Sequence, residues 1–537
     1  MIRPEELKKN EPLLWSAGTG AEVWDMFCAA IAGGLETIQR LVNGNASLVR
    51  CHYSYRTPLY FAVRENQIEV ARFLLEHGAD PLGLAVNDSL LDIARDRGYG
   101  EMEKLLATVY ASTLGASPQG NAVAAAIRER HPEEVRSLLD ASPELLHAGD
   151  ERRNQPIHWA VMTRQIDVID ELLRRGADIN ARRSDGARPI HLSNGDYHYR
   201  GWRDVPQDVA TTAGEVLAHV MARGAYVDIW TAAHSGDLKR VKELLDQDPS
   251  LANRLSDYGG YYLGSGAPLR NAAARGHLEI VKLLLERGAD PNLPEEGIAP
   301  RGHALYSAVY GGHYEIAKLL LEKGAYPNVE VESSADTLSI AILNSDQKMV
   351  DLLVSYGAAR SVGLLAHYGD VPTAAAVFAA NPALADDPGA LGSAAGNGHE
   401  AFVRLMLRYQ PDLARRVAAG AKTRELTELL FQHGMNPSQP DWLRITPLHE
   451  FARKGDVEKA AIFIDHGADL QARDEDIRST PLAWAAKFGQ ILMAELLLKR
   501  GAQPNLPDDP PWATPLAWAT RRGHDQVVGL LKHHGAT

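Results

Sequence analysis

The stretch TPLHEFARKGDVEKAAIFIDHGAD, residues 446–469, recurs with small changes along the 537-residue chain and decides the fold. In every clear copy a proline stands 20 residues before the glycine of a Gly-Ala pair. The clear copies begin at residues 57, 155, 267, 446, 480 and 514. Self-similarity at a fixed period is the signature of a repeat architecture, so one elongated array is predicted rather than several unrelated domains.

Each copy has the pattern of a helix pair. Thr446 is a helix-capping residue, and Pro447 fits the first turn because the N–H that it lacks would be unpaired there. Small alanines then let this inner helix lie close to its neighbours. Gly467 suits the left-handed end of a second, outer helix, and the polar residues after it begin an extended turn. One pair cannot bury its own apolar face, so the pairs must stack.

The motifs TPLH at 446–449 and QPIH at 155–158 resemble the ankyrin repeat. The resemblance implies an all-α ankyrin-repeat solenoid of about 16 helix-turn-helix repeats with extended turns, curved into a superhelix. It also implies that His158, His191 and His449 hold neighbouring turns by hydrogen bonds. Ankyrin proteins recognise partners with the turn tips and the ends of the inner helices, so a protein or peptide partner is expected.

The repeats differ in regularity, which suggests an organisation along the chain. The predicted parts are an N-terminal lead segment at 1–22, an array at 23–410 with insertions at 194–209, 251–267 and 293–303, an irregular repeat or bend at 411–445, and regular C-terminal repeats at 446–537.

Composition restricts the possible partners. The formal net charge is −13, which disfavours binding to nucleic acid or to anionic membranes. There are two cysteines and no uninterrupted apolar run of about 18 residues, so a cytoplasmic protein without a membrane segment is expected. The sequence contains no metal-ligand spacing, phosphate loop or nucleophile elbow. Neither a metal nor a cofactor is therefore expected, while an enzymatic activity assembled from distant turns stays open.

Function is expected where the repeat pattern is broken, because stacking explains the pattern itself. Pro189 stands 35 residues before Gly224, fifteen more than in the clear copies. The extra residues include SNGDYHYRGWRDVP at 193–206 and lie between the inner and the outer helix. The next turn is short, and the one after it, 251–267, is enlarged and rich in tyrosine and glycine.

Aromatic, basic and imidazole side chains are concentrated in these irregular repeats, and such residues are typical of recognition surfaces. The candidates for binding a ligand or a partner are Tyr197, Tyr199, Arg200, Trp202, Arg203, His234, Asp257, Tyr258, Tyr261, Tyr262, Arg275, Arg301, His303, Tyr306 and Tyr310. The candidates for acid-base chemistry are Asp196, His198, Tyr258 and Asp336.

Three functions are compatible with the sequence. The leading one is a scaffold that binds a protein or peptide through its concave face and enlarged central turns. The alternative is a binding or catalytic site for a small molecule, either a sugar or an anionic metabolite, formed by the 194–209 insert and the turns near 257–263, 301–306 and 330–336. The third is an architectural spacer whose insert mediates self-association. A site shared by the insert and the tyrosine-rich turn requires the insert to fold back over the groove.

Overall fold

The computed structural model describes residues 1–13, 16–82, 88–196, 198–258, 262–293, 303–328, 336–417 and 420–537. Within these residues the regular structure consists of helices, with isolated bridges and no strand. The chain divides into two compact units. The larger unit comprises residues 10–95 and 99–359, and the smaller unit comprises residues 1–9, 96–98 and 360–537.

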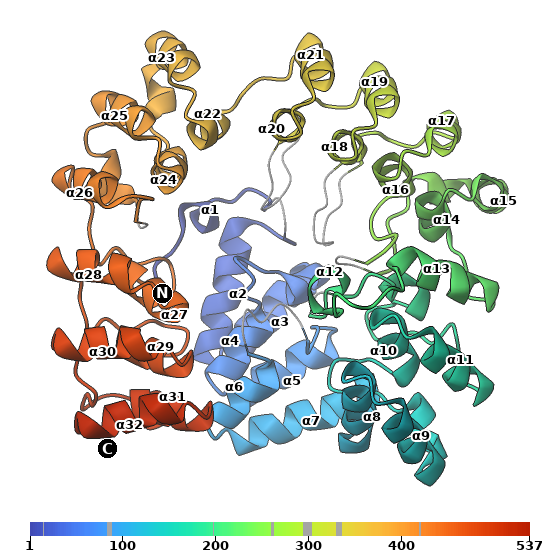
Figure 1. Cartoon of the computed structure of the whole chain (residues 1–537), viewed down its shortest axis with the longest axis horizontal. Helices are drawn as coiled ribbons and strands as arrows, with labels where there is room; N and C mark the ends of the chain where they lie inside the picture. The colour runs from blue at the N-terminus through green and yellow to red at the C-terminus, as the bar shows by residue number, and fades with distance from the viewer. Residues whose placement is uncertain are drawn as a thin grey trace. The chain divides into compact units, whose positions relative to one another are not determined.

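Inner and outer helices alternate along residues 10–359 (Figure 1). The inner helices are α2 (Gly20–Ala32), α4 (Pro58–Arg64), α6 (Leu90–Asp96), α8 (Pro118–Arg128), α10 (Pro156–Met162), α14 (Ile229–Ser235), α16 (Pro268–Ala274), α18 (Ala304–Tyr310) and α20 (Thr337–Leu343). The outer helices are α3 (Leu35–Gly44), α5 (Ile68–Glu76), α7 (Gly100–Leu114), α9 (Pro132–Ala141), α11 (Ile166–Arg174), α13 (Ala213–Ala222), α15 (Leu238–Gln247), α17 (Leu278–Glu286), α19 (Tyr314–Glu322) and α21 (Gln347–Ser355).

The smaller unit continues the same alternation after the short first helix, α1 (Glu5–Lys8). Its inner helices are α22 (Val362–Tyr368), α24 (Pro388–Asn397), α27 (Pro447–Lys454), α29 (Pro481–Lys487) and α31 (Pro515–Arg521). Its outer helices are α23 (Val371–Ala380), α25 (Glu400–Tyr409), α26 (Arg424–Gln432), α28 (Val457–Asp465), α30 (Ile491–Lys499) and α32 (Asp525–His533).

Short helical turns complete the regular structure. One four-residue α-helix, α12 (Gly201–Asp204), lies in the insert. The 3₁₀ helices are η1 (Ala46–Arg50), η2 (Pro143–His147), η3 (Pro189–Leu192), η4 (Pro249–Asn253), η5 (Pro382–Ala385) and η6 (Leu413–Arg416).

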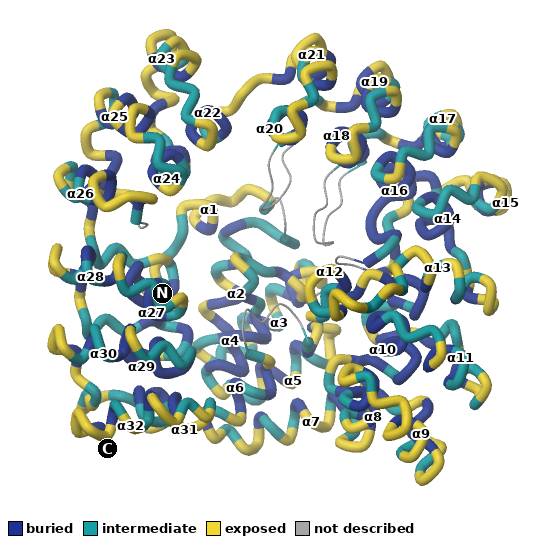
Figure 2. The backbone as a smooth tube through the Cα atoms, in the orientation of Figure 1, coloured by how far each residue is buried: buried dark blue, intermediate teal, exposed yellow. Residues whose placement is uncertain are grey.

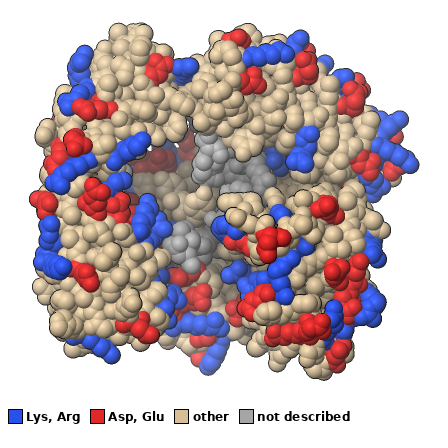
Figure 3. Space-filling view, in the orientation of Figure 1, with Lys and Arg blue, Asp and Glu red and all other residues tan. Residues whose placement is uncertain are grey.

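Stacking of the inner helices forms the core, as the sequence predicts. Within the larger unit α14 packs on α16, α16 on α18 and α18 on α20. The inner helices are mostly buried, whereas the outer helices keep an exposed side (Figure 2). On the face drawn in Figure 3, positive and negative side chains are interspersed over the described residues. That face therefore offers no extended surface of one charge.

Fourteen repeats of the described chain contain both helices, and two lack a complete inner helix. One of the two has η3 in place of the inner helix, and the other has only α26 after η6. The total agrees with the 16 repeats that the spacing predicts. The second exception falls within the irregular stretch 411–445, where the expected bend stays a prediction.

The histidines of the repeat motif connect neighbouring turns, which confirms the role that the resemblance implies. In His158, Nδ1 accepts a hydrogen bond from the Gln155 backbone N–H (3.1 Å), so Nε2 carries the proton and donates to the Ala181 carbonyl (3.0 Å). His449 likewise donates to the Ser479 carbonyl (3.1 Å). Both imidazoles are fully buried, and burial lowers the pKa of each.

Acidification is expected to destabilise the array through His158. Burial, together with nearby Arg183, lowers the pKa of His158 to about 3. The unfolded chain takes up this proton near pH 6.5, so the stability from His158 is complete above pH 6.5 and is lost as the pH falls. The loss between pH 7 and pH 5 is about 2 kcal/mol. Thermal unfolding at pH 7 and at pH 5 measures how much stability is lost on acidification. This loss should be smaller for His158→Gln than for wild type or for the exposed control His147→Gln. An equal loss of stability in all three proteins would contradict the role of His158 in the pH dependence.

Candidate functional site

The inner element of the repeat at 189–222 is shortened. Intact inner helices such as α10 and α16 have seven residues, whereas η3 has four and ends at Leu192. Ser193 and Asn194 then form a turn, and Gly195 has a φ of +89° that favours glycine. A Cβ at Gly195 would also lie 2.0 Å from the Tyr199 carbonyl oxygen. The chain therefore leaves the helical path one turn early.

The insert folds into a compact loop before α13 begins. The Asp196 N–H donates to the Tyr199 carbonyl (2.8 Å), and the Gly201 N–H donates to the Asn194 carbonyl (3.0 Å). The Tyr199 ring packs edge-on against Trp159 of α10, at 5.5 Å between centroids. These contacts hold the insert against the preceding repeat.

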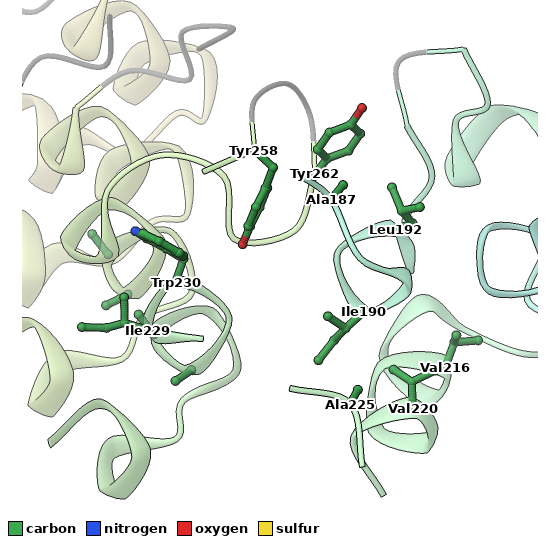
Figure 4. Close-up of a cluster of buried hydrophobic side chains, with 14 of the residues drawn as sticks. Ala187, Ile190, Leu192, Val216, Val220, Ala225, Ile229, Trp230, Tyr258 and Tyr262 are labelled. Carbon is green, nitrogen blue, oxygen red and sulfur yellow. The ribbon is translucent and has the colours of Figure 1, made fainter. Parts of the chain in front are cut away.

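Tyr258, from the enlarged turn, fills the space beside the shortened inner element (Figure 4). Its ring stacks on His191 of η3 at 3.8 Å and meets Trp230 of α14 edge-on at 6.0 Å. The side chain is 2% exposed. A tyrosine from a later turn therefore supplies packing between η3 and α14, so the two irregular features compensate each other.

Arg183, in the turn before η3, joins the insert to the enlarged turn. Its Nη1 donates to Asp196 (3.0 Å), and its Nη2 donates to Asp185 (2.6 Å) and to the Tyr262 hydroxyl (2.6 Å). Tyr262 in turn donates to Asp185 (2.8 Å). Arg153 of the preceding turn pairs with Asp185 at 3.5 Å. Because Asp196 and Tyr262 share Arg183, the start of the insert is connected to the tyrosine-rich turn.

The ionisation of this network follows from its charges. Burial raises the pKa of Asp196, but attraction to Arg183 together with hydrogen bonds from the Tyr199 N–H and from Arg183 outweighs burial, so the pKa lies below its usual range. The same balance lowers the pKa of Asp185, with a further contribution from Arg153. Burial raises the pKa of the Tyr262 phenol, so its hydroxyl stays protonated and can donate to Asp185. The network therefore consists of charged carboxylates around a buried guanidinium.

A cleft of about 680 Å³ lies where the second half of the inner helix is missing. This volume is within the range of ligand-binding sites. The lining includes 193–194 at the start of the insert, one side of α13, the end of α14 with 236–237, residues 262–264, and α16 from Arg270 to its end with Arg275 and His277.

The walls of the cleft differ in chemistry. On α13, Leu217, Ala218 and Met221 are at least partly exposed, because η3 is too short to cover them. On α16, Arg270 is buried and donates to the Ser265 carbonyl and the Asn271 side chain, while Arg275 is exposed. An apolar wall thus faces a wall that carries two guanidinium groups.

Three residues singled out from the sequence, His234, Tyr262 and Arg275, line the cleft. Trp202 does not line the cleft and is 74% exposed. The residue before it, Gly201, donates through its backbone N–H to the carbonyl of the cleft residue Asn194. Their roles in binding stay predictions.

The other binding candidates lie outside the cleft lining. In the insert, Tyr199 donates to the Asp204 carbonyl (3.1 Å), Arg203 pairs with Asp204 (2.6 Å), and the Arg200 backbone N–H donates to the Asp204 side chain. Asp257 lies near Arg254 at 3.4 Å. On α18, Tyr306 is buried and stacks with the exposed Tyr310, and His303 precedes the helix. Tyr197, Tyr261 and Arg301 fall outside the described residues.

The four candidates for acid-base chemistry are not gathered in the cleft. Asp196 is committed to Arg183 and to two backbone N–H groups, and burial raises the pKa of Tyr258 well above its usual range. Asp336 caps α20 by accepting from the Ser339 N–H (2.7 Å). His198 is exposed on the insert. The structure therefore gives no support for a joint catalytic role of these residues.

Some residues of the site escaped sequence reasoning. The sequence of α13 is that of an ordinary amphipathic outer helix. Its cleft-facing side is exposed only because η3 is too short to cover it. In the sequence Arg183 looks like an ordinary turn residue. Its partners Asp196 and Tyr262 are 13 and 79 residues away, so their contact with Arg183 is visible only in the structure. One signal was present: Ser193, Asn194 and Gly195 are turn-forming residues, whereas none of the six clear copies has serine, asparagine or glycine at these positions.

Stacked helix pairs with extended turns define a class of repeat scaffold, and this class generally serves in protein interactions. The family model described as ankyrin repeats matches residues 14–83, 90–183, 229–331, 269–362 and 416–508. These segments cover more than half of the chain, so the chain belongs to the ankyrin-repeat family. Residues 184–228, which hold η3, the insert and α13, lie between the matched segments.

Curated relatives share only part of their length with this chain. Palmitoyltransferase ZDHHC13 of Mus musculus is 25% identical over 169 residues, or 31% of this chain and 27% of that protein. Palmitoyltransferase AKR1 of Lachancea kluyveri is 28% identical over 156 residues, or 29% of this chain and 20% of that protein. The probable E3 ubiquitin-protein ligase XBOS33 of Oryza sativa subsp. japonica is 49% identical over 63 residues, or 12% of this chain and 11% of that protein. The chain thus spans less than a third of each relative.

None of the helices in the described ranges has the length and apolar character needed to cross a membrane. The same ranges contain no cluster of three or more His, Cys, Asp or Glu side chains arranged to hold a metal ion.

Proposed function

We propose that this protein is an interaction scaffold whose protein partner binds at the irregular central repeats, with the cleft between α13 and α16 as the centre of the interface. The observation that carries this proposal is the missing half of an inner helix, which opens a concave site in an otherwise continuous stack. Concave sites with mixed apolar and polar walls are typical binding sites.

Exposed side chains around the cleft support a larger contact area. Trp202 follows the loop that borders the cleft, and large exposed aromatic residues often dominate binding energy. The ends of successive inner helices continue the surface: His234 lies in the last turn of α14, Arg275 follows α16 and Tyr310 ends α18. We place the interaction in the cytoplasm, because two cysteines in 537 residues are too few for a disulfide framework.

Filling the cleft is expected to abolish partner binding. Ala218→Trp places an indole from the exposed side of α13 into the cleft, whereas Ala222→Trp adds the same group to α13 outside the cleft lining. Quantitative affinity purification with the full chain should show partners that wild type and Ala222→Trp retain and Ala218→Trp loses by at least tenfold. Equal capture by all three proteins would overturn the proposal. Circular dichroism of each variant checks that the fold is intact.

A further inference from the structure

The charges around the cleft are unequal. Arg270 and Arg275 line it, and Asp237 is the one carboxylate among its described lining residues. The Asp237 side chain already caps α15 by accepting from the Arg240 N–H (2.9 Å). The negative charge in the lining is therefore directed at a helix N-terminus, where it is favourable.

Arg275 has capacity for a further acceptor. It is exposed and forms no ion pair with the described residues. Arg164 reaches the cleft residue Asn194 at 3.4 Å but does not itself line the cleft. A carboxylate that enters the cleft can therefore pair with Arg275 through a charge-assisted hydrogen bond.

The apolar wall narrows the choice of ligand. Leu217 and Met221 of α13 are half-buried and face the same cleft as the arginines. A small anion alone would leave this wall in contact with water, and a purely apolar ligand would leave the exposed Arg275 without an acceptor. A ligand that carries both an acidic and an aliphatic group matches both walls.

We infer that the cleft binds a peptide segment of the partner in which an aspartate or glutamate stands close to a leucine, isoleucine, valine or methionine. The inference rests on the proposed function and adds the chemistry of the partner. In this arrangement the acidic side chain lies against Arg275, with Arg270 in the same wall, and the aliphatic side chain covers Leu217 and Met221.

A random twelve-residue peptide library displayed on phage tests this chemistry. The full-length protein is the target, and phage that also bind Ala218→Trp are removed first. Peptides that remain are expected to be enriched in an acidic residue beside an aliphatic one. Fluorescence anisotropy with the selected peptide should show Kd increased at least tenfold by Arg275→Glu, because a charge-assisted contact is replaced by repulsion. Lys242→Glu, which makes the same charge change at an exposed site on α15, should change Kd less than twofold.

The outcomes separate this inference from the proposed function. Selected peptides without acidic residues, or with a Kd that Arg275→Glu leaves unchanged, would overturn the acidic-aliphatic chemistry and leave the cleft as a binding site. Failure to select any peptide, combined with a protein partner that Ala218→Trp loses, would also overturn the inference, because the partner would then present a folded surface. Partners insensitive to Ala218→Trp would overturn the proposed function itself.

Discussion

Replacement of Arg183 by methionine is expected to lower the free energy of unfolding by about 3–5 kcal/mol, the usual effect of breaking a buried ion pair from one side. The Arg183 side chain is 2% exposed, and it neutralises Asp185 and Asp196. Methionine fills much of the same volume but leaves two carboxylates in a buried site. The loss should appear in thermal unfolding, and amide exchange should increase in the insert and in the enlarged turn.

Two further variants test the cause of this loss. Arg182→Met changes the exposed neighbour and should alter stability by less than about 0.5 kcal/mol. Adding Asp196→Asn to Arg183→Met removes one of the stranded charges and should restore part of the stability. A double variant no more stable than Arg183→Met would show that packing, not charge, dominates at this position.

Tyr258→Ala is expected to cost about 3–5 kcal/mol, because it removes a large buried ring and leaves a cavity. The ring stacks on His191 and contacts Trp230, so its loss separates η3 from α14. Urea unfolding followed by circular dichroism measures the change. Amide exchange should rise in η3, although η3 belongs to an earlier repeat than the substituted residue.

Tyr258→Phe is the matched control, since it keeps the ring and removes the hydroxyl. It should stay within about 1 kcal/mol of wild type. If Tyr258→Ala also changed stability by no more than this, the enlarged turn would not support the shortened inner element, and the two irregular features would be independent.

Much of the fold was predictable because its local rules are strong. The spacing between Pro447 and Gly467 predicts a helix pair, and α27 and α28 occupy that interval. The same spacing located the insert between η3 and α13. It did not show that the inner element itself ends at Leu192, since inserted residues can be counted without knowing which helical residues have been lost.

The site was less predictable for a physical reason. His234, Tyr262 and Arg275 stood out because they depart from the repeat pattern. Leu217 and Ala218 follow that pattern, and their exposure comes from a neighbour that is missing. A contact that does not form leaves no mark on the residues it would have covered, so such a wall becomes visible only in three dimensions.

The support that Tyr258 gives to η3 also bears on how such an array can change during evolution. Repeat arrays gain and lose members by duplication and deletion, and most repeats tolerate this because each one contacts only its neighbours. Here a residue preceding α16 completes the packing of an element two repeats earlier. Loss or duplication of the repeat between η3 and α16 would therefore separate Tyr258 from His191, so we expect residues 189–274 to be gained or lost only together.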